Sequence, residues 1–258
     1  MRVTRELRIL EDPDHLYRVA AAEFVRRAAE SVEARGTFTV ALSGGSTPRG
    51  LYALLAREGP DAVRTRIPWQ RIRFFWGDER HVPPDHPDSN YRLAHETLLS
   101  RVPVPASHIH RIPAERSDPD EAAEAYAETL RERVRSGDGG LPRLDLVLLG
   151  MGGDGHTASL FPGSGAVHER ERLVAAPWVE KLRAYRITLT PPVLNNAACV
   201  LFLVAGADKA ETLQAVLSEG NQPDRFPARI IRPTNGELLW LVDRAAGRRL
   251  AGGGVAGN

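Results

Sequence analysis

Cysteine is almost absent from this chain of 258 residues, with Cys199 as the single example. One cysteine excludes a disulfide within the chain and indicates a reducing compartment. The first ten residues lack the apolar core of a secretory signal peptide. The longest apolar run, residues 197–207, is about half of the roughly 20 residues that a membrane-spanning helix needs. We therefore expect a cytoplasmic protein with no membrane partner.

An excess of charge of one sign is also missing, because 34 Lys and Arg residues face 33 Asp and Glu residues. Nucleic-acid-binding domains carry a basic stripe or excess, so we expect no nucleic-acid partner. His108 and His110 alternate like strand residues, but no third ligand lies in register with them. We therefore predict no metal site. We expect a monomer or a small homo-oligomer.

Hydrophobic periodicity predicts strands that alternate with helices along most of the chain. The predicted strands are residues 37–42, 71–76, 144–149, 186–190, 199–204 and 238–242. The predicted helices are residues 12–33, 48–57, 90–99, 118–135 and 208–217, a short one from residue 191, and one after the last strand. This alternation implies an α/β fold, in which a mostly parallel sheet has helices on both faces.

The loop of residues 137–140 is the best candidate for a domain boundary, but the predicted strands on its two sides fit one sheet. We therefore expect a single domain over residues 1–258. The glycine-rich tail, residues 251–258, is expected to be disordered.

Residues 144–162, LDLVLLGMGGDGHTASLFP, carry the most informative signal in the sequence. An apolar strand ends in glycines, and Asp154 and His156 follow in a turn. Ligands of open α/β sheets bind at the carboxyl ends of strands, and an imidazole there can take a proton from water. A lone histidine is more often structural, but Asp154 and the position at a strand end favour His156 as a catalytic base.

The glycines of this segment also match G-x-G-x-x-G, the dinucleotide-binding pattern. That pattern should open a long helix, whereas Pro162 and Gly163 stop any helix within about two turns. We therefore predict no dinucleotide site.

A second segment, SGGSTP at residues 43–48, joins a predicted strand to a predicted helix. Its glycines let backbone N–H groups approach an anion, Ser46 or Thr47 can cap the helix, and Pro48 suits the first turn. A phosphate would be favoured at that helix end, although an ordinary capped turn has the same pattern. The spacing matches neither a P-loop nor the G-x-S-x-G turn of serine esterases. The candidate phosphate-binding residues are Ser43, Gly44, Gly45, Ser46 and Thr47.

The charged residues Asp78, Glu79 and Arg80 follow the apolar run RIRFFW directly. Charges at the end of a buried strand need partners or a function. One interpretation is an internal Asp–Arg or Glu–Arg ion pair. The other gives Arg80 to an anionic substrate or a developing oxyanion.

Three segments, SGGSTPRGLY, FFWGDERHVPPDHPDSNY and LGMGGDGHTASLFPGS, resemble the signature segments of the 6-phosphogluconolactonases. The later segments RITLTPPVLNNAACVLFLVAGADKAETL and FPARIIRPTNGELLWLVDRAA resemble the same family. The resemblance spans nearly the whole chain. It implies the three-layer, Rossmann-like α/β/α fold of the glucosamine-6-phosphate deaminases and ribose-5-phosphate isomerases.

The resemblance also implies an activity, hydrolysis of 6-phospho-D-glucono-1,5-lactone in the pentose phosphate pathway, with no cofactor. It makes His156 the general base with Asp154 as its neighbour, and it gives Arg80 to the charge at the reacting carbonyl. A contact of Arg80 with the substrate phosphate, rather than with the reacting carbonyl, remains an alternative. The implied substrate-binding residues are the 43–47 loop, Asp78, Arg186 and Lys209.

Two other functions fit the same fold. An amino-sugar-phosphate isomerase or deaminase should carry D-E-Y at residues 78–80 and should lack the HTASLFP continuation. A non-catalytic sugar-phosphate sensor would normally be attached to a helix-turn-helix, but the first 40 residues predict only one helix.

Overall fold

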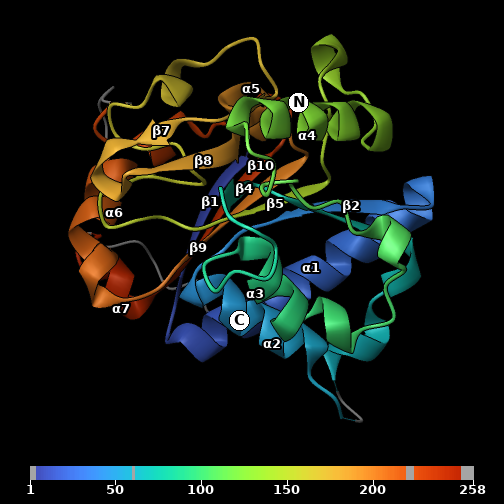
Figure 1. Cartoon of the computed structure of the whole chain (residues 1–258). Coiled ribbons are helices and arrows are strands. Elements are labelled where there is room, and N and C mark those ends of the chain that lie inside the picture. Colours follow the sequence, from blue (N-terminus) through green and yellow to red (C-terminus); the bar gives the residue numbers. More distant parts are fainter. Residues whose placement is uncertain (1–3, 60–61, 219–223, 251–258) are drawn as a thin grey trace.

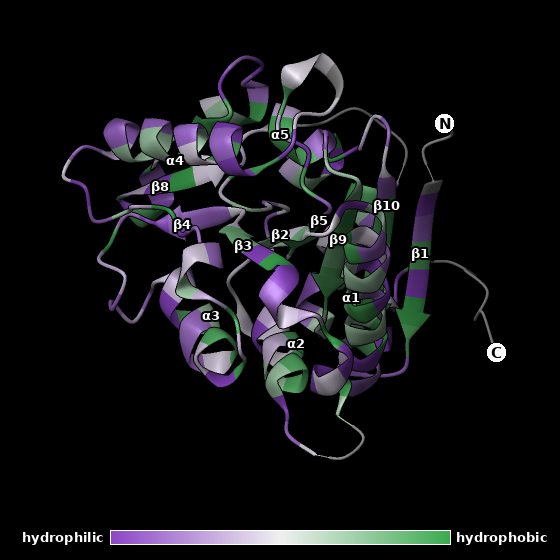
Figure 2. Cartoon of the chain, turned by 90° about the vertical axis from the view of Figure 1, so that its right-hand side faces the viewer, coloured by the Kyte–Doolittle hydropathy of each residue, from purple (hydrophilic) through white to green (hydrophobic). Residues whose placement is uncertain are grey.

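Six parallel strands form the main sheet of this computed structural model, which describes residues 4–59, 62–218 and 224–250. Their spatial order is β1 (Thr4–Leu10), β10 (Glu237–Asp243), β9 (Cys199–Val204), β5 (Leu146–Leu149), β2 (Phe38–Leu42) and β3 (Ile72–Trp76). Figure 2 shows the strands in this order, with β1 at one outer edge. The predicted parallel sheet is confirmed.

Helices cover both faces of this sheet (Figure 1). On one side lie α1 (Pro13–Arg35), α2 (Ser46–Ala56) and α3 (Asn90–Thr97). On the other side lie α4 (Pro119–Arg133) and the short α5 (Pro191–Asn195). Two further helices, α6 (Ala210–Leu217) and α7 (Arg244–Gly247), pack against each other, and α7 reaches β1 and β10. The arrangement is the expected three-layer α/β/α fold.

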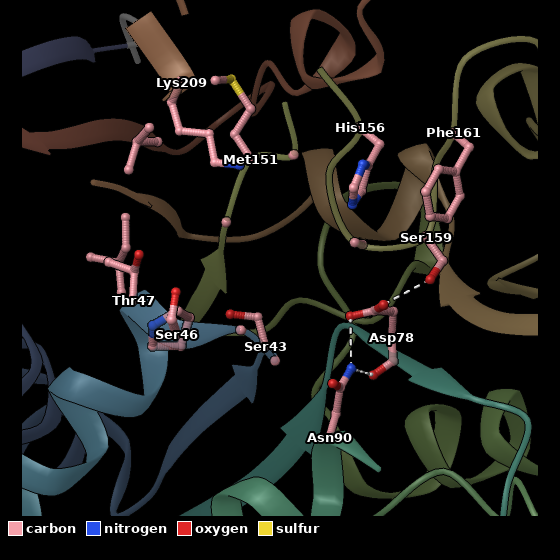
Figure 3. Close-up of a pocket in the computed structure, with 18 of the residues that line it drawn as sticks. Ser43, Ser46, Thr47, Asp78, Asn90, Met151, His156, Ser159, Phe161 and Lys209 are labelled. Carbon is pink, nitrogen blue, oxygen red and sulfur yellow. Dashed lines mark hydrogen bonds between the residues drawn. The ribbon is translucent and has the colours of Figure 1, made fainter. Parts of the chain in front are cut away.

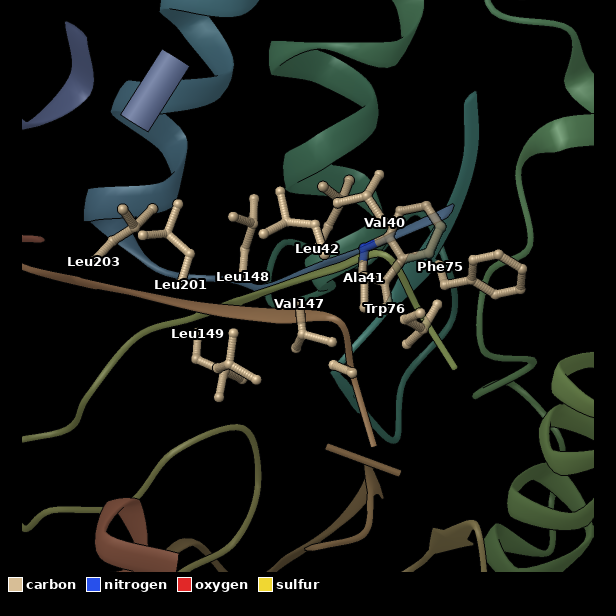
Figure 4. Packing of buried hydrophobic residues seen from close by; sticks show 14 of the residues in the cluster. Val40, Ala41, Leu42, Phe75, Trp76, Val147, Leu148, Leu149, Leu201 and Leu203 are labelled. Carbon is tan, nitrogen blue, oxygen red and sulfur yellow. The ribbon is translucent and has the colours of Figure 1, made fainter. Parts of the chain in front are cut away.

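The central strands are apolar on both faces, as strands of a covered parallel sheet should be. Every residue of β2, β5 and β9 is buried. In Figure 4, Leu148 lies on one side of the sheet, and Val147 and Leu149 lie on the other. Between β9 and β10, the rings of Phe202 and Trp240 stack with centroids 3.8 Å apart. This packing gives a rigid base to the loops at the strand ends.

A second, small antiparallel sheet lies beside the main one and was not predicted. It contains β4 (Asp78–Arg80), β8 (Ala184–Leu189) and β6 (Val174–Ala175), and β7 (Trp178–Val179) also pairs with β8. The predicted strand 186–190 therefore exists, but its place in the parallel sheet was wrong. The first half of β8 is exposed or half-buried, which suits a small outer sheet better than a covered centre.

The other predicted elements are present with shifts of a few residues at their ends. The strand β1 was missed because its alternating charges hide the apolar pattern of an edge strand. His108 ends a short 3-10 helix (Ala106–His108), and Ile109 makes only an isolated bridge to Phe74, so the strand-like pattern of the two histidines was misleading. The predicted disordered tail, residues 251–258, lies outside the described residues.

Strands before and after the 137–140 loop share the main sheet, as expected. Within the described part of the chain, no helix is long and apolar enough to cross a membrane. The same residues contain no group of three or more His, Cys, Asp or Glu side chains that could hold a metal ion.

Candidate active site

A pocket of about 490 Å³ opens at the carboxyl ends of β9, β5, β2 and β3, which are neighbours in the main sheet. This is the edge at which open α/β sheets bind ligands. Nearly all of the predicted site residues line it: Ser43, Gly44, Gly45, Ser46, Thr47, Asp78, Arg80, His156, Arg186 and Lys209. The structure thus gathers side chains from five separate segments of the chain.

The loop between β2 and α2 forms one wall of the pocket (Figure 3). The helix begins at Ser46, two residues earlier than predicted, and its N-cap is Gly45, with φ of 106°. No side chain caps it, so the predicted capping by Ser46 or Thr47 is wrong. A glycine cap is favoured here because other residues rarely adopt this φ. The N–H groups of the first turn are therefore left to an anion or to water.

The opposite wall carries His156, which is held by Asp154. The Nδ1 atom of His156 lies 2.5 Å from Oδ1 of Asp154, which also accepts a 3.1 Å hydrogen bond from the His156 backbone N–H. An ionised carboxylate only accepts, so Nδ1 carries the proton and Nε2 is free to take one. The His156 side chain is 30% exposed, and in Figure 3 it faces the wall of Ser46 and Thr47 across the opening.

The imidazole packs closely against Gly152 and Phe161. A Cβ atom at Gly152 would lie 2.1 Å from the ring, so only glycine leaves room for it. The ring of Phe161 stacks on His156 with centroids 4.3 Å apart. A packed aromatic ring fixes the orientation of the imidazole, which a positioned base requires.

Lys181 is a pocket residue that the sequence analysis missed. Its Nζ atom forms an ion pair with Oδ2 of Asp154 and lies 4.6 Å from the centroid of the Phe161 ring. Partial burial opposes ionisation of Asp154, but hydrogen bonds from His156 and Lys181 lower its pKa well below the usual range. Asp154 is therefore a stable anion at neutral pH. Lys181 is 27 residues away in sequence, and no local pattern connects the two.

The buried carboxylates of Asp78 and Glu79 do not pair with Arg80, so the structure does not support the first of the two interpretations, an internal ion pair within residues 78–80. Glu79 accepts hydrogen bonds from the N–H groups of Arg80, Asn90 and Tyr91 at 2.7–2.8 Å. Arg80 belongs to β4, and the other two donors are the first residues of α3. Burial raises the pKa of Glu79, although these donors oppose the change. The role of Glu79 is to hold β4 against α3.

Asp78 faces the pocket instead. Its Oδ2 accepts a 2.7 Å hydrogen bond from Ser159, and its Oδ1 lies 3.3 Å from the donor Nδ2 of Asn90 (Figure 3). Ser159 and Asn90 also line the pocket and were not predicted. A carboxylate held in this way can still accept a hydrogen bond from a ligand hydroxyl.

Two arginines from the second sheet add positive charge. Arg80 and Arg186 lie opposite each other in the register of β4 and β8. Among the described residues, neither has a carboxylate oxygen within 4.0 Å; Arg80 donates to the backbone oxygen of Asp88. Burial and then the charge of Arg80 lower the pKa of Arg186. Two neighbouring guanidinium groups of this kind have donors that can bind an anion.

Lys209 supplies charge from the other end of the pocket. It belongs to a 3-10 helix, η8 (Ala207–Lys209), that follows β9, and its Nζ lies 3.0 Å from the exposed carboxylate of Asp208. Figure 3 shows Lys209 above Ser46 and Thr47, on the same side of the opening. The pocket therefore combines a histidine that is held by a carboxylate with two cationic ends.

The chain is similar to known proteins over most of its length. A family model described as glucosamine-6-phosphate isomerases/6-phosphogluconolactonase matches residues 11–240. The chain is 45% identical over 221 residues to 6-phosphogluconolactonase of Nostoc sp., covering 86% of this chain and 88% of that protein. It is 44% identical over 223 residues to 6-phosphogluconolactonase of Homo sapiens, covering 84% and 82%.

Solved structures agree with this. The structure of 6-phosphogluconolactonase from Trypanosoma brucei is similar with a TM-score of 0.84 and 31% identity, covering 97% of this chain and 100% of the other. A monomeric glucosamine-6-phosphate deaminase has a TM-score of 0.78 over 95% of this chain and 99% of its own. At 21% identity, that likeness shows a shared fold only.

Proposed function

Because this chain belongs to the family of glucosamine-6-phosphate isomerases and 6-phosphogluconolactonases, we propose that it hydrolyses 6-phospho-D-glucono-1,5-lactone with His156 as the general base. The protein is a lactone-hydrolysing enzyme of the pentose phosphate pathway, like its 6-phosphogluconolactonase relatives. The roles of its individual side chains are the substance of the proposal.

The neutral imidazole of His156 takes a proton at Nε2 from a water molecule, whose oxygen attacks the C1 carbonyl carbon. The carbonyl oxygen becomes an oxyanion, and the bond from C1 to the ring oxygen then breaks. The imidazolium returns its proton to the leaving ring oxygen, so the products are the ring-opened acid and the unchanged enzyme. Asp154 supports this step because its charge stabilises the imidazolium and fixes the tautomer.

The phosphate binds at the other end of the pocket, between the uncapped N-terminus of α2 and Lys209. The helix end and the ammonium group both favour a negative charge there. Ser43, Ser46 and Thr47 supply hydroxyl groups at this wall, and the Ser43 oxygen is buried without a partner among the described residues. Binding energy from the phosphate positions C1 against the attacking water.

Arg80 and Arg186 stabilise the oxyanion end, because two guanidinium groups can donate hydrogen bonds to a developing negative charge. Asp78 accepts a hydrogen bond from a sugar hydroxyl in the middle of the pocket. Under this assignment the phosphate and the reacting carbonyl contact different cations. The alternative, with Arg80 on the phosphate, predicts that its substitution changes KM rather than kcat.

The observation that carries the proposal is the shared pocket of His156 and the α2 N-terminus, with Nδ1 bound to Asp154 and Nε2 free. The test is a hydrolysis assay with freshly generated lactone, corrected for spontaneous ring opening. Replacement of His156 by Ala should lower kcat by roughly 10² to 10⁴, the usual contribution of a positioned base. A kcat equal to that of the wild type would remove His156 from the mechanism.

Glucosamine 6-phosphate serves as the control substrate, because the matching family model also covers the isomerases. We expect no release of ammonia from it. We also propose that residues 1–258 work as one domain, because the pocket takes residues from both sheets. The cytoplasmic location, the absence of nucleic-acid and membrane partners, and the small oligomeric state stay predictions.

A further inference from the structure

Lysine is rare in this protein. The 34 basic residues include only two lysines, Lys181 and Lys209, and all the others are arginines. Both lysines line the same pocket. Arginine serves every other cationic position of the chain, so the two exceptions indicate that these positions need a compact ammonium group rather than a planar guanidinium. Lys209 is already accounted for at the phosphate end.

Lys181 contacts both groups that hold the imidazole of His156. It lies in a 3-10 helix, η7 (Glu180–Leu182), between β7 and β8 of the second sheet. Its Nζ pairs with Oδ2 of Asp154, while Oδ1 of Asp154 binds the imidazole. The same ammonium lies 4.6 Å from the centroid of the Phe161 ring, and that ring stacks on the imidazole of His156. Four side chains therefore form a closed ring of contacts.

We propose that Lys181 is a positioning residue, which orients Asp154 and Phe161 around His156 and whose positive charge offsets part of the negative charge that Asp154 presents to the imidazole. The inference rests on the proposed function, because it concerns the base of that reaction. It adds a residue from the second sheet to a site whose base and phosphate loop both come from the main sheet.

The charge of Lys181 acts on His156 in the opposite direction to the charge of Asp154. A carboxylate beside an imidazole stabilises the imidazolium form. The positive charge of Lys181 offsets part of this effect, although solvent screens it because the side chain is 50% exposed. Loss of that charge therefore moves the acid limb of the activity profile to higher pH.

The geometry of the ion pair with Asp154 explains why residue 181 is a lysine. An ammonium group can bind one oxygen of Asp154 as a point charge and leave Oδ1 to His156. A guanidinium group prefers to bind both carboxylate oxygens, so it would compete with Nδ1 of His156. Arginine at position 181 should keep the charge but loosen the orientation of the base.

Other charged groups face His156 across the pocket and must be kept constant in any test. They come from β4, β8 and η8, and they are Asp78, Arg80, Arg186, Asp208 and Lys209. The test therefore changes position 181 alone. A matched control is Glu180→Gln, an exposed neighbour in the same helix whose carboxylate binds the indole of Trp178 at 2.8 Å.

The experiment measures kcat/KM for lactone hydrolysis between pH 5 and 8 in the wild type and in three variants, Lys181→Met, Lys181→Arg and Glu180→Gln. We expect Lys181→Met to move the acid limb upward by ~0.5–1 pH unit and to lower kcat several-fold. Lys181→Arg should leave the limb in place while lowering kcat. Glu180→Gln should change neither quantity.

An NMR titration of the His156 ring gives a readout that does not depend on activity. The His156 signal is assigned by its loss in His156→Ala, and its midpoint should rise in Lys181→Met. The inference is wrong if a folded Lys181→Met protein has the same acid limb of the pH–activity profile and the same NMR titration midpoint as the wild type. A rise in KM alone would also overturn it, by making Lys181 a substrate contact. Failure of the proposed function has a different signature, namely a wild type without lactonase activity.

Discussion

Ser159 donates a 2.7 Å hydrogen bond to Oδ2 of Asp78 across 81 residues of sequence. Ser159 lies three residues after His156 in the loop that follows β5, and Asp78 is the first residue of β4. Both side chains are buried. This contact fixes the loop that carries the base against the small sheet that carries the two arginines. The backbone N–H of Ser159 also donates a 3.2 Å hydrogen bond to Oγ1 of Thr188 in β8, so two buried hydrogen bonds from Ser159 join the two halves of the pocket.

Replacement of Ser159 by Ala should loosen that connection. Loss of a hydrogen bond to a buried carboxylate costs about 1–3 kcal/mol, and water in the adjoining pocket keeps this cost at the low end. We expect a decrease of about 1 kcal/mol in the free energy of unfolding, measured with urea. We also expect a lower kcat, because the base loses its alignment with the oxyanion end. Ser164→Ala, which removes a serine outside the pocket, should leave kcat unchanged.

Gly152→Ala should displace the imidazole without changing any charged group. The added Cβ would lie 2.1 Å from ring atoms of His156, so the ring must move. We expect kcat to fall by about 10²-fold, the scale of a misplaced catalytic group, with a smaller change in KM. Gly150→Ala is the control, because a Cβ there meets nothing within 4 Å. Equal kcat values for the two alanine variants would contradict the close packing of the base.

Lys209→Met tests the phosphate end. Removal of one ammonium from an anion site should raise KM by about tenfold and leave kcat nearly unchanged, because the contact is the same in substrate and transition state. Inhibition by inorganic phosphate should weaken in parallel. A fall in kcat with KM unchanged would assign Lys209 to the reacting carbonyl instead.

His110, which does not line the pocket, gives a pH dependence of stability. Burial, followed by the charges of Arg133 and Arg73, lowers the pKa of His110 to about 4 from an ordinary value of 6.5. Between these values the unfolded chain binds a proton that the folded protein does not, so stability falls as pH decreases from 6.5 to 4. Above that range the penalty is absent.

His110→Phe should flatten the pH dependence in this window. The phenyl ring keeps the stacking on Phe75, where the centroids are 4.9 Å apart in the wild type. The measurement is the unfolding free energy from urea titrations at pH 7, 6 and 5. The variant should lose less stability than the wild type between pH 7 and pH 5. Parallel curves would show that another group controls acid sensitivity.

Much of the site could be predicted from short segments. The glycine-rich run before His156 and the SGGSTP turn are local signals, because each marks the carboxyl end of a strand. Parallel strands place those ends at one edge of the sheet, so the two segments had to meet. The structure brings both to one pocket. The capping detail was wrong, since a glycine and not a hydroxyl residue precedes α2.

The second sheet could not be predicted from local sequence patterns. Its strands have two to six residues, which is too short for a clear period. The antiparallel pairing of β4 with β8 also joins segments about a hundred residues apart. The charges of residues 78–80 left two interpretations open, because sequence cannot show whether backbone N–H groups or a side chain will bind a buried carboxylate.

The sequence by itself determined the α/β class and the family and singled out a candidate base, because strand periodicity, glycine turns and strand-end polar residues are encoded over a few neighbouring positions. Tertiary structure alone decided which groups surround that base. Lys181, Ser159 and Asn90 reach the pocket through contacts between distant segments. Such contacts depend on how the two sheets pack together, and packing is a property of the whole chain rather than of any one segment.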